Sequence, residues 1–427
     1  MLVEFTVNNF KSIKDTVTFS MLASSKDEGN SFQKRKYNLL KSAILYGANA
    51  SGKSNFLRAM AFMKRFVLNQ YKIIQSTDKL PHEPFRLSTE TEDASSSFEV
   101  VFFIDNTKYR YGFEIDQESV YSEWLYADEK GKEAKLFYRD TDETEYVNPN
   151  KFVEGYKFFD KKDGKINISH NQLFLWKCDN EKDGLISKSI LHWFNQYNMI
   201  DGIDHTGYIN FTMKKMENED FKDKIIELVK TADIGIDNLQ VEVEEDNFPP
   251  EVLEHLQKFL ETKQITDTKP KLISSNINTS HQKFDNDGNA VNNVIFKLEE
   301  EESKGTRKFF AMSAPILDTL KNGKVLVIDE LDASLHPILT QHLIKLFHDE
   351  NVNKNNAQLI FATHDTNLLK KTIFRRDQIW LSEKDKYGST DLYSLAQFKN
   401  VRKNEDFEKQ YIHGKYGAIP YLGKFEF

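Results

Sequence analysis

The chain has 427 residues, of which 39% are hydrophobic, 13% aromatic and 29% charged, and its formal net charge is −8. This length and composition suit a globular protein of two or three domains with sizeable cores, and the acidic balance excludes a global cationic field that would attract nucleic acid nonspecifically. The single cysteine, Cys178, excludes an intrachain disulfide and a cysteine-based zinc or iron–sulfur site.

The N-terminal residues carry neither the basic region nor the continuous apolar core of a signal peptide. No apolar run in the sequence approaches the roughly 20 residues that a membrane-spanning helix needs. We therefore expect a cytoplasmic protein without a membrane partner, in a reducing compartment that fits the low cysteine count.

The first predicted unit is a strand, a glycine-rich loop and a helix. Residues 2–7 and 16–21 are expected to form strands, and the short apolar strand at 42–46 leads directly into the loop. The helix should begin near residues 52–53, because apolar residues recur after them at helical spacing. These residues are Phe56, Met60, Met63 and Val67.

The loop fits the pattern GxxxxGK[ST], and the flanking strand and helix are the context that this pattern requires. Its backbone N–H groups would wrap phosphate oxygens, its lysine would reach the β- and γ-phosphates of ATP, and its serine would bind Mg²⁺. The alternative is an ordinary glycine-rich turn. Besides binding the nucleotide, Lys53 is a candidate catalytic residue and Ser54 is a candidate metal ligand. The residues assigned to nucleotide binding are Gly47, Ala48, Asn49, Ala50, Ser51, Gly52, Lys53, Ser54 and Asn55.

From about residue 98 the apolar period changes to two, which predicts an antiparallel β-meander. Its strands are expected at 98–104, 108–115, 120–126 and 135–138. Helical spacing then recurs at 185–196, 220–230 and 251–263. The polar segment 262–281 is expected to be a loop, and Asp285–Gly288 is expected to be a hairpin turn rather than a calcium site.

An α/β pattern returns towards the C-terminus. It comprises helix 308–320, strand 324–328, helix 337–348, strand 358–362, helix 366–372 and closing strands at 378–381 and 391–394. The apolar run before Asp329 predicts a strand buried on both faces, and open α/β sheets place ligands at the carboxyl ends of such strands. Asp329 is therefore a candidate Mg²⁺ ligand, and Glu330 is the candidate general base that polarises water. The alternative is a pair of exposed acids at the end of a buried strand.

Three further residues in two places are candidates for nucleotide contacts. His364 follows the strand at 358–362, where its imidazole could hydrogen-bond the γ-phosphate; the alternative is a bystander beside a helix cap. Ser303 and Gly305 open a helix whose N–H groups and dipole favour an anion; the alternative is a plain N-cap.

A group of four basic residues is interpreted as an exposed helix end, with nucleic-acid contact as the alternative. Its members are Lys370, Lys371, Arg375 and Arg376.

The order of these motifs resembles that of ABC-type ATPase heads, which the SMC, RecF and OLD groups share. More closely, the chain resembles the RloA- and AriA-like ATPases of bacterial abortive-infection and restriction loci. The nucleotide motifs are shared widely, whereas the stretches in the insert and the tail are specific. The stretches that carry the resemblance are Asn9–Ile13, Tyr109–Ile115, Ser122–Leu125, Glu302–Thr306, Asp329–Pro337 and Gly414–Pro420.

Together with the long gap between Lys53 and Asp329, the resemblance implies a split ABC-type P-loop head in an α/β fold. Residues 1–70 and 291–427 would form the head, and residues 71–290 an inserted β-meander and helical region. It also implies a head-to-head homodimer or higher homo-oligomer. ATP would lie between one subunit's loop and the other's Ser303 and Gly305, and Asp332 would begin the loop that crosses between the two sites. The usual LSGGQ-like signature is reduced here to those two residues, and no glutamine can be placed as the lid residue that contacts Mg²⁺.

We therefore expect a Mg²⁺-dependent ATPase that acts as a switch, which by resemblance serves antiviral defence. Only 63 residues follow His364, too few for the nuclease domain that OLD-type proteins append, so the effector, a nuclease or toxin, is expected to be a separate protein. The alternative is a RecF- or SMC-like DNA-binding ATPase in repair or chromosome maintenance. The acidic charge and the lack of a basic stripe or a coiled-coil pattern count against it, and nucleic-acid binding is open but not indicated.

Overall fold

The computed structural model describes residues 1–25, 29–142, 144–182, 184–202, 206–232, 235–246, 251–252, 272–399 and 405–420. Contacts divide the chain into two compact units, residues 1–203 with 318–427 and residues 204–317. These boundaries differ from residues 70 and 290, where the sequence places the ends of the insert. The difference arises because the meander strands pair with the N-terminal strands. The division at 70 and 290 stays a prediction.

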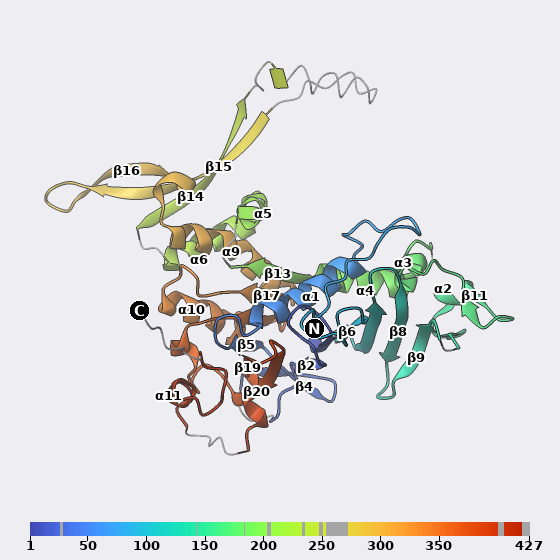
Figure 1. Cartoon of the computed structure of the whole chain (residues 1–427). Helices are drawn as coiled ribbons and strands as arrows, with labels where there is room; N and C mark the ends of the chain where they lie inside the picture. Colours follow the sequence, from blue (N-terminus) through green and yellow to red (C-terminus); the bar gives the residue numbers. More distant parts are fainter. Residues whose placement is uncertain are drawn as a thin grey trace. The chain divides into compact units, whose positions relative to one another are not determined.

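The first unit contains a six-stranded sheet of order β13-β17-β18-β5-β19-β20 (Figure 1). Neighbouring strands are parallel except β19 and β20, and β5 and β18 are buried along their whole length. Burial on both faces is what their continuous apolar runs predict. The strands are β5 (Ser42–Tyr46), β13 (Tyr197–Asp201), β17 (Val325–Asp329), β18 (Gln358–Ala362), β19 (Ile379–Lys384) and β20 (Thr390–Ser394).

The same unit contains a seven-stranded antiparallel sheet of order β10-β9-β8-β7-β6-β1-β2. Its strands are β1 (Leu2–Asn8), β2 (Val17–Ser20), β6 (Ser96–Ile104), β7 (Thr107–Ile115), β8 (Val120–Asp128), β9 (Ala134–Asp140) and β10 (Tyr146–Val147). Strands β6 to β9 lie where the period of two predicts them. Because β6 pairs with β1, the meander extends the N-terminal strands instead of forming a sheet of its own.

Two stretches of the resemblance have structural roles in this sheet. Trp124 lies across from Gly112 on the neighbouring strand, and a Cβ atom at Gly112 would come within 2.4 Å of the Trp124 ring. Glu123 is fully buried. Its carboxylate accepts hydrogen bonds from the first two amides of α3 (Phe174–Asp179), whose N-terminus it therefore caps. The motif residues here serve packing and capping.

Helix α1 (Lys53–Val67) contributes to one hydrophobic core together with residues of both sheets. The predicted apolar face with Phe56, Met60, Met63 and Val67 is buried. A second face packs on the antiparallel sheet, where the ring centroids of Phe62 and Phe98 are 4.8 Å apart and those of Phe66 and Phe113 are 5.0 Å apart. The helix that follows the glycine-rich loop is therefore fixed from two sides.

Shorter elements complete the first unit. Helix α4 packs against α1 and β6, and α10 packs against β5 and β18. No helix within the described ranges is long and apolar enough to cross a bilayer. The elements are β3 (Ser31–Lys34), β4 (Tyr37–Leu40), α2 (Val153–Tyr156), β11 (Phe159–Asp160), β12 (Lys165–Ile166), α4 (Leu185–Asn195), α10 (Pro337–His348), η1 (Thr366–Leu368), η2 (Arg376–Gln378), η3 (Leu395–Gln397) and α11 (Phe407–Ile412).

The second unit combines helices with a three-stranded antiparallel sheet of order β14-β15-β16 (Figure 1). Its elements are α5 (Thr206–Met216), α6 (Glu219–Ala232), β14 (Ile236–Asp246), β15 (Leu272–Phe284), β16 (Ala290–Lys297), α8 (Leu298–Glu301) and the first part of α9 (Lys304–Asn322). The loop prediction for 262–281 is wrong from residue 272 onward, because the polar segment pairs with β14 and β16. The turn at Asp285–Gly288 is confirmed, since the Gly288 amide donates to the Asp285 carbonyl. Residues 253–271, with most of the predicted helix 251–263, lie outside the described ranges.

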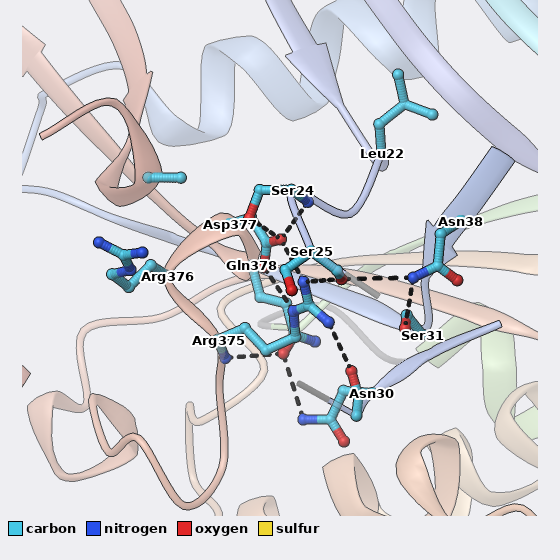
Figure 2. A network of polar contacts seen from close by, with 12 residues as sticks. Leu22, Ser24, Ser25, Asn30, Ser31, Asn38, Arg375, Arg376, Asp377 and Gln378 are labelled. Carbon is cyan, nitrogen blue, oxygen red and sulfur yellow. Dashed lines mark hydrogen bonds and ion pairs between the residues drawn. The ribbon is translucent and has the colours of Figure 1, made fainter. Parts of the chain in front are cut away.

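The segment 370–376 matches only part of the exposed helix end that the sequence predicts, because Lys370 and Lys371 are exposed but do not belong to a helix. Two short 3₁₀ helices, η1 and η2, lie on either side of residues 370–375, and Arg375 is buried, with 5% of its surface exposed. Its guanidinium forms a two-bonded ion pair with Asp377, with Nε 2.8 Å from Oδ1 and Nη2 2.7 Å from Oδ2 (Figure 2). A buried, paired arginine does not present its charge to a nucleic acid.

This ion pair joins two segments that are distant in the sequence (Figure 2). Asp377 accepts hydrogen bonds from the amide and the hydroxyl of Ser24, and Arg375 donates to the carbonyls of Ser25 and Gly29. Burial alone would raise the pKa of Asp377, but the bonds from Arg375 and Ser24 hold it below its usual value. These bonds compensate for removing two charges from water.

We predict that His348 makes the fold sensitive to acid. Its ring lies 2.7 Å from the Ser42 hydroxyl at the start of β5, and burial, with the nearby Lys41 charge, lowers its pKa from 6.5 to about 4. Between these values the unfolded chain takes up a proton that the folded chain does not, so stability falls as pH falls from 6.5 to 4, by on the order of 3 kcal/mol at most. Urea unfolding at pH 7 and pH 4.5 measures this loss.

The matched variant is His348→Gln, which keeps a polar partner for Ser42 but does not titrate. It should lose less stability between the two pH values than the wild type does. His413→Gln, at an exposed position, controls for removing an imidazole elsewhere. The same pH dependence in wild type and His348→Gln would show that His348 is not the acid-sensitive group.

Candidate functional site

The candidate residues lie at one edge of the six-stranded sheet. Strand β5 ends at the loop Gly47–Gly52, β17 ends at Asp329, and β18 is followed by Thr363 and His364. Since β5, β18 and β17 are successive parallel neighbours, their carboxyl ends lie together. The structure therefore brings together the loop, the two acids and His364, which are far apart in the sequence.

The loop has backbone features that would suit phosphate binding. Gly52 has φ 110° and is the N-cap of α1, which has no side-chain cap and no acid in its first turn. Such a helix start presents N–H groups and a positive dipole to an anion. A Cβ atom at Gly52 would lie 2.1 Å from the Thr390 hydroxyl oxygen, so only glycine fits. Ala50 has φ 62°, a conformation that costs a residue with a Cβ atom roughly 1 kcal/mol.

Lys53 is folded back over the start of the loop. It is 5% exposed, and its Nζ donates to the carbonyl oxygens of Gly47, at 2.7 Å, and Ala48, at 3.1 Å. Burial lowers the pKa of Lys53 to about 8, while the charges of Asp329, Glu330 and Asp332 act in the opposite direction. The lysine thus lies within the electrostatic reach of all three acids.

The acids have oxygens that suit a hard cation. Asp329 Oδ1 and Asp332 Oδ1 are buried and have no hydrogen-bond partner among the described residues. No group of three or more His, Cys, Asp or Glu side chains within the described ranges could hold a metal by itself. Mg²⁺ is commonly held by one or two carboxylates together with phosphate oxygens and water, so this donor set fits Mg²⁺ bound with a nucleotide.

Glu330 is held in a strained backbone conformation, with φ 52°. The turn around it is fixed by neighbours: the Gly202 amide donates to the Asp329 carbonyl at 2.8 Å, and the Ala333 amide donates to the Glu330 carbonyl at 3.1 Å. A Cβ atom at Gly202 would come within 2.3 Å of the Asp329 carbonyl. Residues kept in such a conformation cluster at functional sites, which supports a specific task for this glutamate.

A cavity of about 550 Å³ lies beside the loop. His364 is exposed at its wall, and burial of part of its ring, with the Lys53 charge, lowers its pKa below the usual value. The Tyr46 hydroxyl donates to the Asp365 carbonyl at 2.7 Å and so fixes the turn that carries His364. The residues that line the cavity are Tyr46, Gly47–Ser51, His364, Thr366, Ser382–Lys384, Tyr411 and Ala418–Pro420. The tail stretch of the resemblance is thus part of the wall.

The remaining candidates have other surroundings. The Asn55 amide donates to the Ser12 hydroxyl at 2.8 Å, so this side chain binds the protein itself. Ser303 accepts a hydrogen bond from the Thr306 amide at 3.1 Å, which is the geometry of an N-cap. Ser303 and Gly305 belong to the second compact unit, and their role in a dimer stays a prediction.

Sequence reasoning missed the residues that support the loop from outside. The hydroxyls of Ser382 and Thr390 donate to the Ser51 carbonyl in the loop. The Ser12 hydroxyl contacts the loop indirectly, because it accepts a hydrogen bond from Thr390. Only Ser12 had a sequence signal, because it belongs to the stretch Asn9–Ile13. The other two come from the hairpin β19–β20, whose position beside the loop only the fold reveals.

A comparison with protein families identifies the class of this protein. Residues 42–370, more than half of the chain, match the family model described as "AAA domain, putative AbiEii toxin, Type IV TA system". The chain therefore belongs to this AAA-domain family. The match includes the loop, both acids and His364, and it supports the predicted ATPase group with its link to abortive infection; the RloA- and AriA-like branch stays a prediction. No curated protein matches the chain.

We predict opposite effects for two substitutions in the loop. Ala50→Gly relieves the strained φ and should stabilise the fold by up to about 1 kcal/mol. Gly52→Ala should destabilise it by roughly 2–4 kcal/mol, because the new Cβ meets Thr390 and the backbone conformation disfavours it. Urea unfolding measures both. Gly207→Ala is the control, since nothing lies within 4 Å of a Cβ at Gly207; a Gly52→Ala variant as stable as that control would contradict the prediction.

Proposed function

We propose that this protein is a Mg²⁺-dependent ATP-binding and ATP-hydrolysing switch. The observation that carries the proposal is the meeting, at one sheet edge, of a glycine-rich loop that leads into a helix N-terminus, a carboxylate oxygen of Asp329 without a partner among the described residues, and the strained Glu330. Membership of an AAA-domain family supports the same function. A glycine-rich turn or a pair of bystander acids would not need these three features together.

Each residue has a distinct task in this proposal. The loop N–H groups and Lys53 bind the phosphates, and Lys53 exchanges its bonds to the Gly47 and Ala48 carbonyls for bonds to phosphate oxygens. Ser54 and Asp329 would hold Mg²⁺, which would neutralise charge on the β- and γ-phosphates. Glu330 accepts a proton from the attacking water, and its fixed backbone keeps the carboxylate oriented. His364 donates a hydrogen bond to the γ-phosphate.

The proposal includes assembly through the nucleotide sites. Two heads would meet so that the Ser303–Gly305 helix start of one subunit faces the loop of the other, which adds a second set of N–H groups to the phosphates. Asp332 would lie in the loop that crosses between the sites. An assembly that closes on ATP and opens after hydrolysis would convert the chemical step into a movement.

The proposed context is antiviral defence, with this chain as the sensor subunit of an abortive-infection-like system. The family description names a toxin and a type IV toxin–antitoxin system, and the sequence resembles ATPases of abortive-infection loci. The switch would control a separate effector, such as a nuclease or toxin. We do not favour the RecF- or SMC-like alternative, because Arg375, a candidate for nucleic-acid contact, is buried in an ion pair.

We predict that Lys53→Ala abolishes ATP binding. The variant removes the cation that the loop holds over the phosphate site, and a loss of at least about 100-fold in affinity is expected for a buried, charge-assisted contact. Titration with a fluorescent ATP analogue, with and without Mg²⁺, measures the affinity. The exposed Lys130→Ala is the control. A wild-type chain that binds no ATP would contradict the proposed function itself.

We predict that Glu330→Gln binds ATP with the affinity of the wild type but hydrolyses it roughly 10²- to 10⁴-fold more slowly, the usual effect of removing a general base. Phosphate release under saturating ATP measures the rate, and size-exclusion chromatography with ATP tests whether the variant accumulates a closed dimer. The exposed Glu129→Gln is the control. Hydrolysis at the wild-type rate would refute the assignment of Glu330.

A further inference from the structure

The carbonyl oxygen of Ser51, the residue before Gly52, is held from outside the loop by two hydroxyl groups. Ser382 Oγ donates to it at 3.1 Å, and Thr390 Oγ1 donates to it at 3.0 Å. Both side chains come from the hairpin β19–β20, and both residues are buried, with exposed fractions of 0% and 3%. A carbonyl with two buried donors is fixed more firmly than an ordinary loop peptide.

Thr390 also belongs to a chain of hydrogen bonds that ends at the first turn of α1. Its hydroxyl oxygen lies 2.8 Å from that of Ser12, and the Asn55 amide donates to Ser12 Oγ at 2.8 Å. Each hydroxyl has one hydrogen to donate. The Thr390 hydroxyl donates both to Ser12 Oγ and to the Ser51 carbonyl, so these two acceptors share its one hydrogen, and the Asn55 amide donates to the same Ser12 oxygen.

Ser12 is itself fixed by the turn in which it lies. The Asn9 side chain donates to the carbonyls of Thr91, Ala94 and Ser95 and accepts from the Phe85 amide. The Ser12 carbonyl accepts from the Thr390 amide at 2.7 Å. The stretch Asn9–Ile13 therefore has a structural role. It connects Thr390, which contacts the glycine-rich loop, to the segment that leads into β6.

We propose that Thr390 is a positioning residue for the nucleotide, with Ser382 and Ser12 as its supports. By fixing the Ser51 carbonyl, its hydroxyl sets the plane of the peptide between Ser51 and Gly52, and with it the direction in which the Gly52 N–H group points towards the phosphates. The Thr390 side chain also fills the space where a Cβ at Gly52 would lie. The inference rests on the proposed function, since it requires that the loop binds ATP.

The test uses the full chain with the variants Thr390→Val and Thr390→Ser. Valine keeps the shape beside Gly52 and removes the hydroxyl, and serine keeps the hydroxyl. We expect Thr390→Val to raise the Kd and the KM for ATP roughly 5- to 20-fold, the cost of one buried hydrogen bond, with kcat within about twofold of the wild type. Thr390→Ser should restore most of the affinity. If Thr390 contributed only to the stability of the fold, its substitution would not raise KM while leaving kcat nearly unchanged.

Thr340→Val is the matched control, because Thr340 is a buried threonine of α10 whose hydroxyl has no partner among the described residues. It should leave Kd and KM unchanged. If Thr390→Val does not fold, Ser382→Ala, which removes the other donor to the same carbonyl, should raise the Kd for ATP in the same direction.

Three results would overturn the inference. One is a wild-type Kd in Thr390→Val, or in Ser382→Ala where the valine variant does not fold. The second is an equal loss of affinity in Thr390→Val and Thr390→Ser. If the wild type binds ATP and Lys53→Ala does not, either result leaves the proposed function standing and removes the role of Thr390 alone. The third is a wild-type chain that binds no ATP, which overturns the function and the inference together.

Discussion

The arrangement of the site depends on the parallel pairing of β5 with β18 on one side and β19 on the other. In this register Leu45 is opposite Ala362, and Tyr46 is opposite Leu381. The glycine-rich loop and the turn with His364 therefore leave the sheet at the same height. Because β5 and β18 are buried on both faces, sliding one of them by a residue would exchange its two sets of side chains and disrupt the packing on each face. The positions of the catalytic candidates thus follow from hydrophobic burial.

The glycine-rich loop is fixed by contacts from three directions. Helix α1 packs into the core of both sheets, the hairpin β19–β20 holds the Ser51 carbonyl, and the turn Asn9–Ile13 reaches Asn55. Such a loop is preorganised, so binding a phosphate costs little ordering entropy. The same contacts connect the loop to the antiparallel sheet, because Asn9 binds the segment that leads into β6. Under the proposed function, these contacts would connect a bound nucleotide to the meander.

The sequence alone predicts the parts of the site that lie at strand ends, because an apolar run followed by a glycine-rich loop or an acid has few other structures. It could not predict partners that only folding brings together. Arg375 pairs with Asp377 and with carbonyls about 350 positions away, and nothing in its basic neighbourhood indicates this. Thr390 has an ordinary strand sequence around it. The polar strand β15 was predicted as a loop because its Ser and Asn residues favour turns, whereas pairing on both sides overrides that preference.

The charges at the site suggest what would offset the unfavourable free energy of its buried oxygens and its strained backbone. The charges of Asp329, Glu330 and Asp332 all act on Lys53, and one oxygen each of Asp329 and Asp332 is buried without a partner in the part of the chain that the structure describes. Buried oxygens without partners disfavour the folded state, and so does the φ of Glu330. Bound Mg²⁺ would supply a cation for the buried carboxylate oxygens, and the phosphates of the nucleotide would supply an anion for Lys53. Binding would therefore offset the unfavourable free energy of these buried groups and stabilise the folded state. Under the proposed function, the presence of the ligand would be coupled to the stability of the surrounding turns, which is the property that a switch requires.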